Sequence, residues 1–497
     1  MNIKRKIVSS SLVLGILLAS IFVHNHYLEE ESVINRQDDT SLPLYRINAE
    51  FNPQEMTISA KQQLTFTNSL DDNLDSIYLH IYPNTFRNRG TAPFEERELT
   101  SVYPNGFSPG WMEIHNVKVK GDVCHYKIIG TNKTILRITL NKPLNIGDTA
   151  DISIEFTVKL PNANTRLGYG EETVNISNWY PILSVYDTTG WNLDPYYSIG
   201  DPFYSEMAIY KVSLAIPKDF SIAATGNIIK MDVDKDNATY WIEADIVRDF
   251  AMVLSKGFDI KEGVINDITV NSFTLGDEKK EEALQYGIDS IEIFNKLFGH
   301  YPYKQISIVA CDFFLGGMEY PNLVMISKNL YEIEEDFPLE YVIAHEIAHQ
   351  WWYGIVGNNE IIEPWLDEAL TEYSTLMYFE EKYGDHIKEQ IFEKMIKAQY
   401  ENFTSIEPDK GEGILRSLRE FESNLEYSSI VYSKGAMFLE ELRNNMGDEA
   451  FLEGIRQYFN QYKYKNATTL DFYELMEANS EKELKPLFEE WLNIKVE

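Results

Sequence analysis

The stretch Tyr341–Gly354, YVIAHEIAHQWWYG, places two histidines four residues apart, with a glutamate directly after the first. Apolar residues recur through it at spacings of three and four, and Pro338 precedes it, which is typical of the first turn of a helix. On such a helix His345 and His349 lie one turn apart on the same face, so both imidazoles can reach one metal ion. Glu346 lies about 100° further round the helix, where it can reach a water beside that ion.

A second helix is predicted over the following stretch EPWLDEALTEYSTLMYFEEKYG, with Pro364 at its first turn and Gly384 at its end. Glu368 follows His349 after 18 intervening residues. If the two helices pack together, His345, His349 and Glu368 hold a zinc ion and leave its fourth position open, which is the arrangement of a catalytic zinc site. Other divalent ions also suit such ligands. The alternative without a metal is a pair of core histidines beside a solvated acidic helix face.

Composition limits the classes of protein to consider. A chain of 497 residues is too long for one core, which predicts two or three domains. The net charge of −34 argues against a nucleic-acid-binding surface, which needs clustered Lys and Arg. Cys124 and Cys311 are too few and too far apart for a cysteine metal site, so zinc must use nitrogen and oxygen ligands. Two buried thiols are expected, with a single disulfide left open.

The N-terminus has the pattern of a targeting segment. Basic residues at positions 4–6 precede an apolar run over residues 7–23, and three glutamates follow at 29–31. This pattern predicts a signal anchor within residues 1–30 that keeps the protein at the cell membrane with the catalytic part outside. The apolar run is at the short limit for a membrane span, so a cleaved signal peptide and secretion are the alternative.

The hydrophobic pattern divides the remaining chain in two. Residues 31–262 contain stretches in which apolar and polar residues alternate, such as ILRITL and ADISIEFTVKLP, and predict a large antiparallel β domain. Residues 263–497 contain the helical patterns EEALQYGIDSIEIFNKLFG, KGAMFLEELRNNMG and DEAFLEGIRQYFNQY, with one short strand, QISIVA. The second part therefore reads as a mainly helical catalytic domain.

Several motifs together resemble the aminopeptidase N-like zinc peptidases, a gluzincin family that includes the leukotriene hydrolase. The first is the H-E-x-x-H motif followed after 18 residues by a glutamate. The others are GGMEY at 316–320, YSKG at 432–435, GDPFYS at 200–205, ATGNI at 224–228 and RDFAMV at 248–253. The resemblance covers roughly residues 40–497. It implies a multidomain β + α fold, in which the N-terminal antiparallel β domain precedes a thermolysin-like, mainly helical zinc peptidase domain with one Zn²⁺ per chain.

The resemblance also implies catalytic roles. Glu346 takes a proton from a zinc-bound water as that water attacks the first peptide bond, and later passes it to the leaving amine. Tyr432, in the YSKG segment, stabilises the oxyanion together with the zinc. Asp367 and Glu372 are candidates to orient the zinc-binding histidines.

Substrate binding is expected at the GGMEY segment. By resemblance its residues Gly316, Gly317, Met318 and Glu319 bind the peptide, and the glycines leave room for the substrate backbone. Glu319 would pair with the free α-ammonium group, so the cut falls after the first residue. Tyr320 stands where the family usually has asparagine, which affects how finely the substrate is positioned.

The predicted function is a zinc aminopeptidase acting on peptides with a free N-terminus. The large helical C-terminal domain of many family members has no counterpart in the sequence, which predicts a more open cleft. Alternatives are an endopeptidase with the same zinc chemistry, a non-catalytic surface protein that binds peptides, and an epoxide hydrolase like the leukotriene enzyme. The preferred N-terminal side chain and the oligomeric state do not follow from the sequence.

Overall fold

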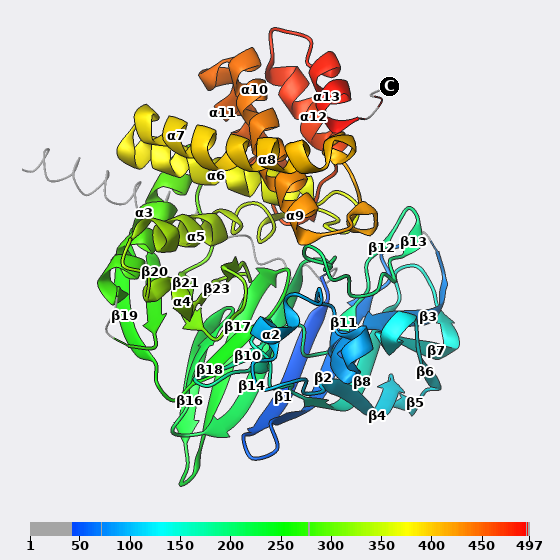
Figure 1. Ribbon diagram of the computed structural model, residues 1–497. Coiled ribbons are helices and arrows are strands. Elements are labelled where there is room, and N and C mark those ends of the chain that lie inside the picture. Colours follow the sequence, from blue (N-terminus) through cyan, green and yellow to red (C-terminus); the bar gives the residue numbers. More distant parts are fainter. Residues whose placement is uncertain (1–41, 71, 277–278, 494, 496–497) are drawn as a thin grey trace, which may run out of the picture. The chain divides into compact units, whose positions relative to one another are not determined.

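Strands occupy the first half of the described chain and helices most of the second half (Figure 1). The computed structural model describes residues 42–497, apart from residues 71, 277–278, 494 and 496–497. The predicted signal anchor or signal peptide at residues 1–30 lies outside this range. Within the described part of the chain, no helix combines the length and the apolar content that crossing a bilayer requires.

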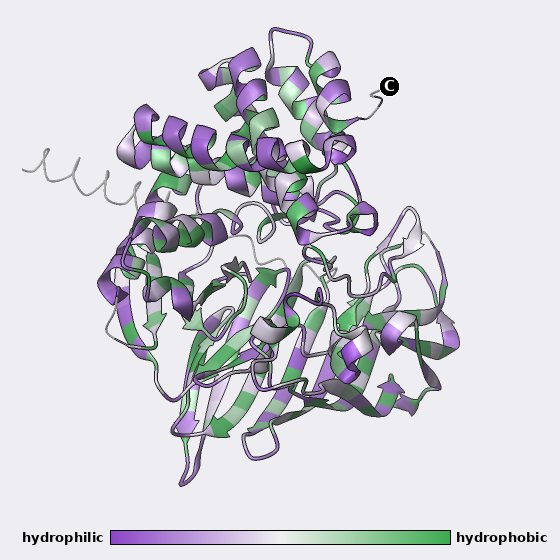
Figure 2. Ribbon diagram, viewed as in Figure 1, coloured by the Kyte–Doolittle hydropathy of each residue, from purple (hydrophilic) through white to green (hydrophobic). Residues whose placement is uncertain are grey.

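The largest sheet has eight strands in the order β16-β17-β14-β1-β2-β8-β4-β5. Figure 2 shows apolar and polar residues alternating along its strands, as the sequence pattern predicts. Along β8, for example, Ile152, Ile154 and Val158 are fully buried. The strands run β1 Leu44–Asn52, β2 Thr57–Thr67, β4 Trp111–Val119, β5 Asp122–Val123, β8 Thr149–Lys159, β14 Ala208–Pro217, β16 Asn227–Val233 and β17 Asn237–Val247.

One pair in this sheet departs from the predicted antiparallel arrangement, because β1 and β14 are parallel. The other neighbouring strands of the sheet are antiparallel. Most of the β-rich region lies between β1 and β14 in the chain, so no hairpin turn sets their relative direction. The alternating pattern is the same for both directions and does not reveal such a pair.

Two four-stranded sheets, ordered β15-β18-β10-β9 and β11-β3-β7-β6, share a hydrophobic core with the large sheet. Cys124 and Cys311 are both buried in this core and are free thiols, as expected. The strands of the two sheets run β3 Leu74–His80, β6 Tyr126–Ile129, β7 Ile135–Leu144, β9 Leu167–Tyr169, β10 Thr173–Ile176, β11 Ile182–Leu183, β15 Ser221–Ala224 and β18 Met252–Ser255.

A mixed five-stranded sheet, ordered β19-β20-β21-β23-β22, follows in the chain. Its strands run β19 Asp259–Ile265, β20 Ile268–Thr274, β21 Gln305–Cys311, β22 Gly317–Met318 and β23 Leu323–Ser327. The sequence pattern predicts only β21 of these as a strand of the catalytic domain. The domain boundary expected between residues 262 and 263 falls inside β19, which pairs along its length with β20.

Helices α3 and α5 pack on this five-stranded sheet, and α6 packs on both helices. Helix α6 begins after Pro364 and ends at Tyr383, directly before Gly384, whose φ of 86° suits glycine. Its predicted boundaries are therefore correct. The longer helices run α3 Lys280–Leu297, α5 Phe337–Ala348, α6 Trp365–Tyr383, α7 Asp385–Ile391, α8 Ala398–Ile406, α10 Gly435–Met446, α11 Asp448–Tyr462, α12 Thr469–Asn479 and α13 Lys485–Leu492.

Candidate active site

Helix α5 and the residue that directly follows it supply the two histidines of the H-E-x-x-H motif. Leu339, Ile343 and Ile347 form its fully buried stripe, which holds the helix in the core of the helical region. The helix ends at Ala348, so His349 is the first residue beyond it. The backbone of His349 keeps a right-handed helical conformation, which leaves its side chain one turn below that of His345.

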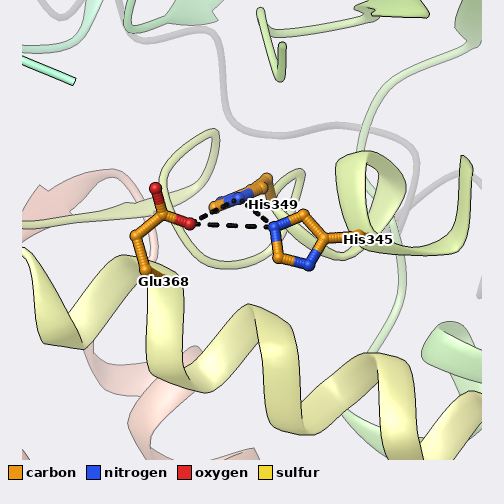
Figure 3. A group of neighbouring side chains, drawn as sticks. All are labelled: His345, His349 and Glu368. Atoms are coloured by element: carbon orange, nitrogen blue, oxygen red, sulfur yellow. Dashed lines mark hydrogen bonds and ion pairs between the residues drawn. The ribbon is translucent and has the colours of Figure 1, made fainter. Parts of the chain in front are cut away.

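Three donor atoms converge between α5 and α6 (Figure 3). His345 Nε2 lies 3.2 Å from His349 Nε2, and Glu368 Oε2 lies 3.3 Å from His349 Nε2 and 3.7 Å from His345 Nε2. Donors about 2.0–2.1 Å from one tetrahedral zinc ion would lie about 3.3–3.4 Å from each other. Glu368 Oε2 is buried and has no hydrogen-bond partner among the described residues. The three side chains therefore fit a zinc ion, with an open fourth position.

The remaining ring nitrogens of both histidines face carboxylates. His349 Nδ1 lies 2.7 Å from Asp367 Oδ1, and His345 Nδ1 lies 3.0 Å from Glu372 Oε2. Tyr341 donates a hydrogen bond of 2.7 Å to the other oxygen of Glu372. Contacts of this kind fix the orientation of an imidazole and direct its Nε2 lone pair toward the metal position.

The charges of the cluster favour a cation at its centre. Burial alone would raise the pKa of Glu368, but its contacts with His345 and His349 lower this pKa to about 2. Burial lowers the pKa of His345, whereas its contacts with Glu368 and Glu372 outweigh that effect and raise the pKa to about 9. Histidines that hold a proton this strongly sit in a negative environment, which also attracts a metal ion.

Glu346 lies on α5 and meets the GGMEY segment at Gly317. A Cβ atom at residue 317 would lie 2.5 Å from Glu346 Cγ, so only glycine allows this approach. Burial raises the pKa of Glu346 to about 7, although both zinc-site histidines act to lower it. One oxygen of Glu346 is buried without a partner in the described chain. The carboxylate is thus placed and tuned to exchange a proton near neutral pH.

Glu319 follows strand β22 and is buried, with 4% of its surface exposed. Its Oε1 atom has no hydrogen-bond partner in the part of the chain that is described. Donor atoms of Glu319, His349 and Asp367 lie within 4.8 Å of one another. Burial and the nearby Asp201 raise the pKa of Glu319 well above its ordinary value. A positively charged group beside Glu319 would relieve this unfavourable burial of a carboxylate.

Tyr432 reaches the same cluster from the π-helical segment η7, Ser428–Lys434. Its hydroxyl donates a hydrogen bond to Glu368 Oε1, and its ring stacks on His345 at 5.8 Å between centroids. Burial raises the pKa of Tyr432 well above its ordinary value, so the hydroxyl keeps its proton and remains a donor. Tyr432 thus contacts two of the predicted zinc ligands, Glu368 and His345.

Three further residues beside the site have no predicted role. Gln350 follows His349, and its Nε2 donates to the backbone oxygens of Glu319 at 3.3 Å and Tyr320 at 3.2 Å. Arg166 and Asp201 form a buried ion pair. Asp201 lies in the GDPFYS stretch, whereas Arg166 is in none of the motifs. Local sequence patterns do not reveal that charged side chains of the β domain lie beside the site.

Comparison with known proteins identifies the helical region. Residues 282–491 match the peptidase family M1 domain. The chain is 26% identical over 304 residues to the probable aminopeptidase 2 of Sulfurisphaera tokodaii, covering 57% of this chain and 38% of that protein. It is 23% identical over 407 residues to aminopeptidase N of Lactobacillus helveticus, covering 77% of this chain and 46% of that protein. The chain therefore spans less than half the length of these two relatives.

The fold agrees with these matches. The M1 zinc metallopeptidase of Deinococcus radiodurans superposes with a TM-score of 0.62 at 16% identity, over 88% of this chain and 90% of that one. That likeness covers both the β-sheet domain and the helical domain. The helical region of the chain thus carries the domain of peptidase family M1, the aminopeptidase N-like zinc metallopeptidases.

Proposed function

We propose that the protein is a zinc-dependent aminopeptidase that removes residues one at a time from the N-terminus of peptides. The observation that carries this proposal is the buried Glu319 side chain, which has an oxygen within 4.8 Å of His349 and whose Oε1 has no hydrogen-bond partner among the described residues. The ammonium group of a free N-terminus would pair with it and offset the cost of its burial. The names of the relatives, which are aminopeptidases, support the same activity.

One zinc ion per chain would be held by His345, His349 and Glu368, whose donor separations suit tetrahedral coordination. When bound, zinc supplies a Lewis acid that polarises the scissile carbonyl and makes water more acidic. Asp367 and Glu372 hold the two imidazoles in the orientation that binding requires.

Three side chains around the proposed zinc position have separate roles in the reaction. Glu346, with its pKa raised to about 7, takes a proton from the attacking water and passes it to the leaving amine. Tyr432 turns its protonated hydroxyl from Glu368 to the oxyanion that forms at the scissile carbon. Glu319 holds the substrate ammonium group, so the first peptide bond is the one presented to Glu346.

A cavity of about 210 Å³ lies beside Tyr432 and would hold a substrate side chain. Aromatic rings form much of its wall, and the ion pair of Arg166 with Asp201 also lines it. This lining favours a large side chain, because aromatic walls contribute apolar contact area. The aromatic wall residues are Phe94, Tyr197, Phe314, Tyr427 and Tyr432.

The test compares one peptide with a free N-terminus and its N-acetylated form, incubated with the zinc-loaded full chain and analysed by mass. Stepwise loss of N-terminal residues from the free peptide alone is the expected result. Internal cuts in both peptides would make the protein an endopeptidase and remove the proposed role of Glu319. No cleavage of either, with zinc bound, would favour a non-catalytic peptide-binding protein. Glu346→Gln, purified in parallel, shows whether a contaminating peptidase is responsible.

We also propose that residues 1–30 anchor the protein in a membrane with the catalytic part outside the cell. The support is the basic segment at 4–6 before the apolar run at 7–23. Fractionation of producing cells should find the protein in the membrane fraction with an intact N-terminus. A shortened protein in the medium would instead show a cleaved signal peptide.

A further inference from the structure

Tyr320, directly after Glu319, connects the site to the β domain. Its side chain is fully buried and belongs to the hydrophobic core of the β sheets, whereas α5 and α6 belong to the core of the helical region. The Tyr320 hydroxyl donates to Ser177 Oγ at 2.7 Å and also lies 3.3 Å from Asn178 Oδ1. The residue that follows the predicted ammonium anchor is therefore tied to a different part of the fold.

The acceptors of Tyr320 are themselves held in place. Ser177 uses its own hydroxyl proton for the backbone oxygen of Arg166 at 2.8 Å, so its oxygen is left to accept from Tyr320. Asn178 donates its amide to Asp249 Oδ2 at 3.0 Å, which directs Oδ1 toward Tyr320. The backbone of Asn178 has a φ of 47°, a left-handed conformation that asparagine tolerates better than most residues. Ser177 and Asn178 therefore both use their donors elsewhere and present acceptor oxygens to the Tyr320 hydroxyl.

Gln350 holds the same segment from the other side. Its side chain donates to the backbone oxygens of Glu319 and Tyr320, and its Oε1 accepts from the backbone N–H of Asn322 at 2.9 Å. Because Gln350 follows His349, these bonds set the distance between Glu319 and the zinc ligands. The hydrogen bonds of Tyr320 and Gln350 together fix the position and the orientation of the Glu319 backbone.

Two glycines and a short strand lie on the N-terminal side of Glu319. Gly316 and Gly317 precede Glu319 and have no side chains to pack, and strand β22 is only two residues long. Glycine at 317 is required by the approach of Glu346. The Glu319 Oε1 atom lacks a partner of its own in the described chain, so its position depends on the backbone that carries it.

We infer that Tyr320 is a positioning residue for recognition of a free N-terminus. Its hydroxyl, through Ser177 and Asn178, holds Glu319 where the carboxylate can pair with the substrate ammonium group. This inference rests on the proposed aminopeptidase function. It assigns a role to the side chain of Tyr320, which reaches Ser177 and Asn178 in the β domain.

The test measures binding and needs no turnover. In a zinc-loaded full chain carrying Glu346→Gln, calorimetry gives dissociation constants for trialanine and N-acetyl-trialanine. Their ratio measures how strongly the free ammonium group is preferred. Tyr320→Phe keeps the ring and removes the hydroxyl, and we expect it to reduce this ratio about tenfold, the loss expected when a charge-assisted contact is misaligned. Zinc content should not change.

Two variants separate positioning from simple stability. Tyr378→Phe removes another buried tyrosine hydroxyl, which donates to Glu340 at 2.8 Å, and should lower the melting temperature without changing the ratio. Ser177→Ala should reduce the ratio as Tyr320→Phe does, and the double variant should add little, because both remove the same hydrogen bond. An unchanged ratio in Tyr320→Phe overturns the inference alone. A wild-type background that binds both peptides equally overturns the proposed function and the inference with it.

Discussion

His349 Nδ1 lies 2.7 Å from Asp367 Oδ1, while the other ring nitrogen of His349 lies 3.3 Å from Glu368 Oε2. Adjacent residues of helix α6 thus contact the two nitrogens of one imidazole. The Asp367 contact keeps the proton of a neutral ring on Nδ1, so that the Nε2 lone pair is free to bind a metal.

Asp367→Ala should weaken zinc binding about 10- to 100-fold, the usual effect of losing a carboxylate behind a metal-binding histidine. Competition with a fluorescent chelator measures the zinc dissociation constant. Glu381→Ala removes a partly exposed carboxylate from the same helix, one that pairs with Lys296 at the surface, and should leave the constant unchanged. Equal zinc affinity in Asp367→Ala and the wild type would show that Asp367 does not support the metal site.

Gly317→Ala should reduce kcat by about 100-fold, because the new Cβ would displace Glu346 from the attacking water. The matched control is Gly316→Ala. A Cβ at residue 316 has Val342 as its nearest neighbour, at 3.5 Å, which is ordinary contact distance. Steady-state kinetics on a peptide with a free N-terminus should find a much smaller effect for this control. If the two variants lose the same activity, the close approach of Gly317 to Glu346 is not what matters.

Tyr432→Phe should lower kcat by about 100- to 1,000-fold with little change in KM, because the hydroxyl acts on the oxyanion and not on the bound substrate. The Tyr432 hydroxyl also contacts Glu368, a proposed zinc ligand, so zinc content must be measured beside kcat. Full zinc occupancy with a large fall in kcat supports the role in catalysis. A loss of zinc that accounts for the lost activity would make Tyr432 a support for the metal site instead.

His80, a buried histidine of strand β3, should make the protein sensitive to acid. Its Nε2 lies 3.2 Å from the backbone oxygen of Asn192, and its Nδ1 is buried without a partner in the described residues. Burial lowers the pKa of His80 to about 4, although the hydrogen bond to Asn192 acts to raise it. The unfolded chain, in which histidine has a pKa of about 6.5, therefore binds this proton more strongly than the folded protein.

Acid should therefore lower the free energy of unfolding through His80. His80 does not affect the free energy of unfolding above pH 6.5, and it reduces that energy as the pH falls from about 6.5 toward 4. At pH 4.5 the reduction should be about 2 to 3 kcal/mol. His80→Phe retains the ring that stacks on Tyr82 and should lack this contribution. Denaturant unfolding at pH 7 and 4.5 gives the free energy of unfolding of the wild type and of the variant. The difference between the two proteins measures the contribution of His80, because acid releases zinc from both.

Local patterns in the sequence are sufficient to predict the elements that carry the metal ligands. The spacing of His345 and His349 requires one helix face, and Pro364 and Gly384 mark the two ends of α6. These predictions succeed because helix periodicity and terminal residues act within a few turns of the chain. The pairing direction of β1 with β14, and the membership of β19 in the five-stranded sheet, are set by contacts between distant segments and do not follow from such patterns.

The sequence by itself therefore determined the β-then-helix order, and it supplied the proposed zinc ligands and the resemblance that points to Glu319 and Tyr432. Only the tertiary structure decided that Glu319 is buried with its Oε1 unpaired among the described residues, that Tyr432 donates to Glu368, and that Tyr320 donates to Ser177. The physical reason is the separation along the chain of the residues that interact. Ligand spacing on a helix is a property of a few consecutive residues, whereas the burial and hydrogen bonding of a side chain depend on which remote segments pack around it.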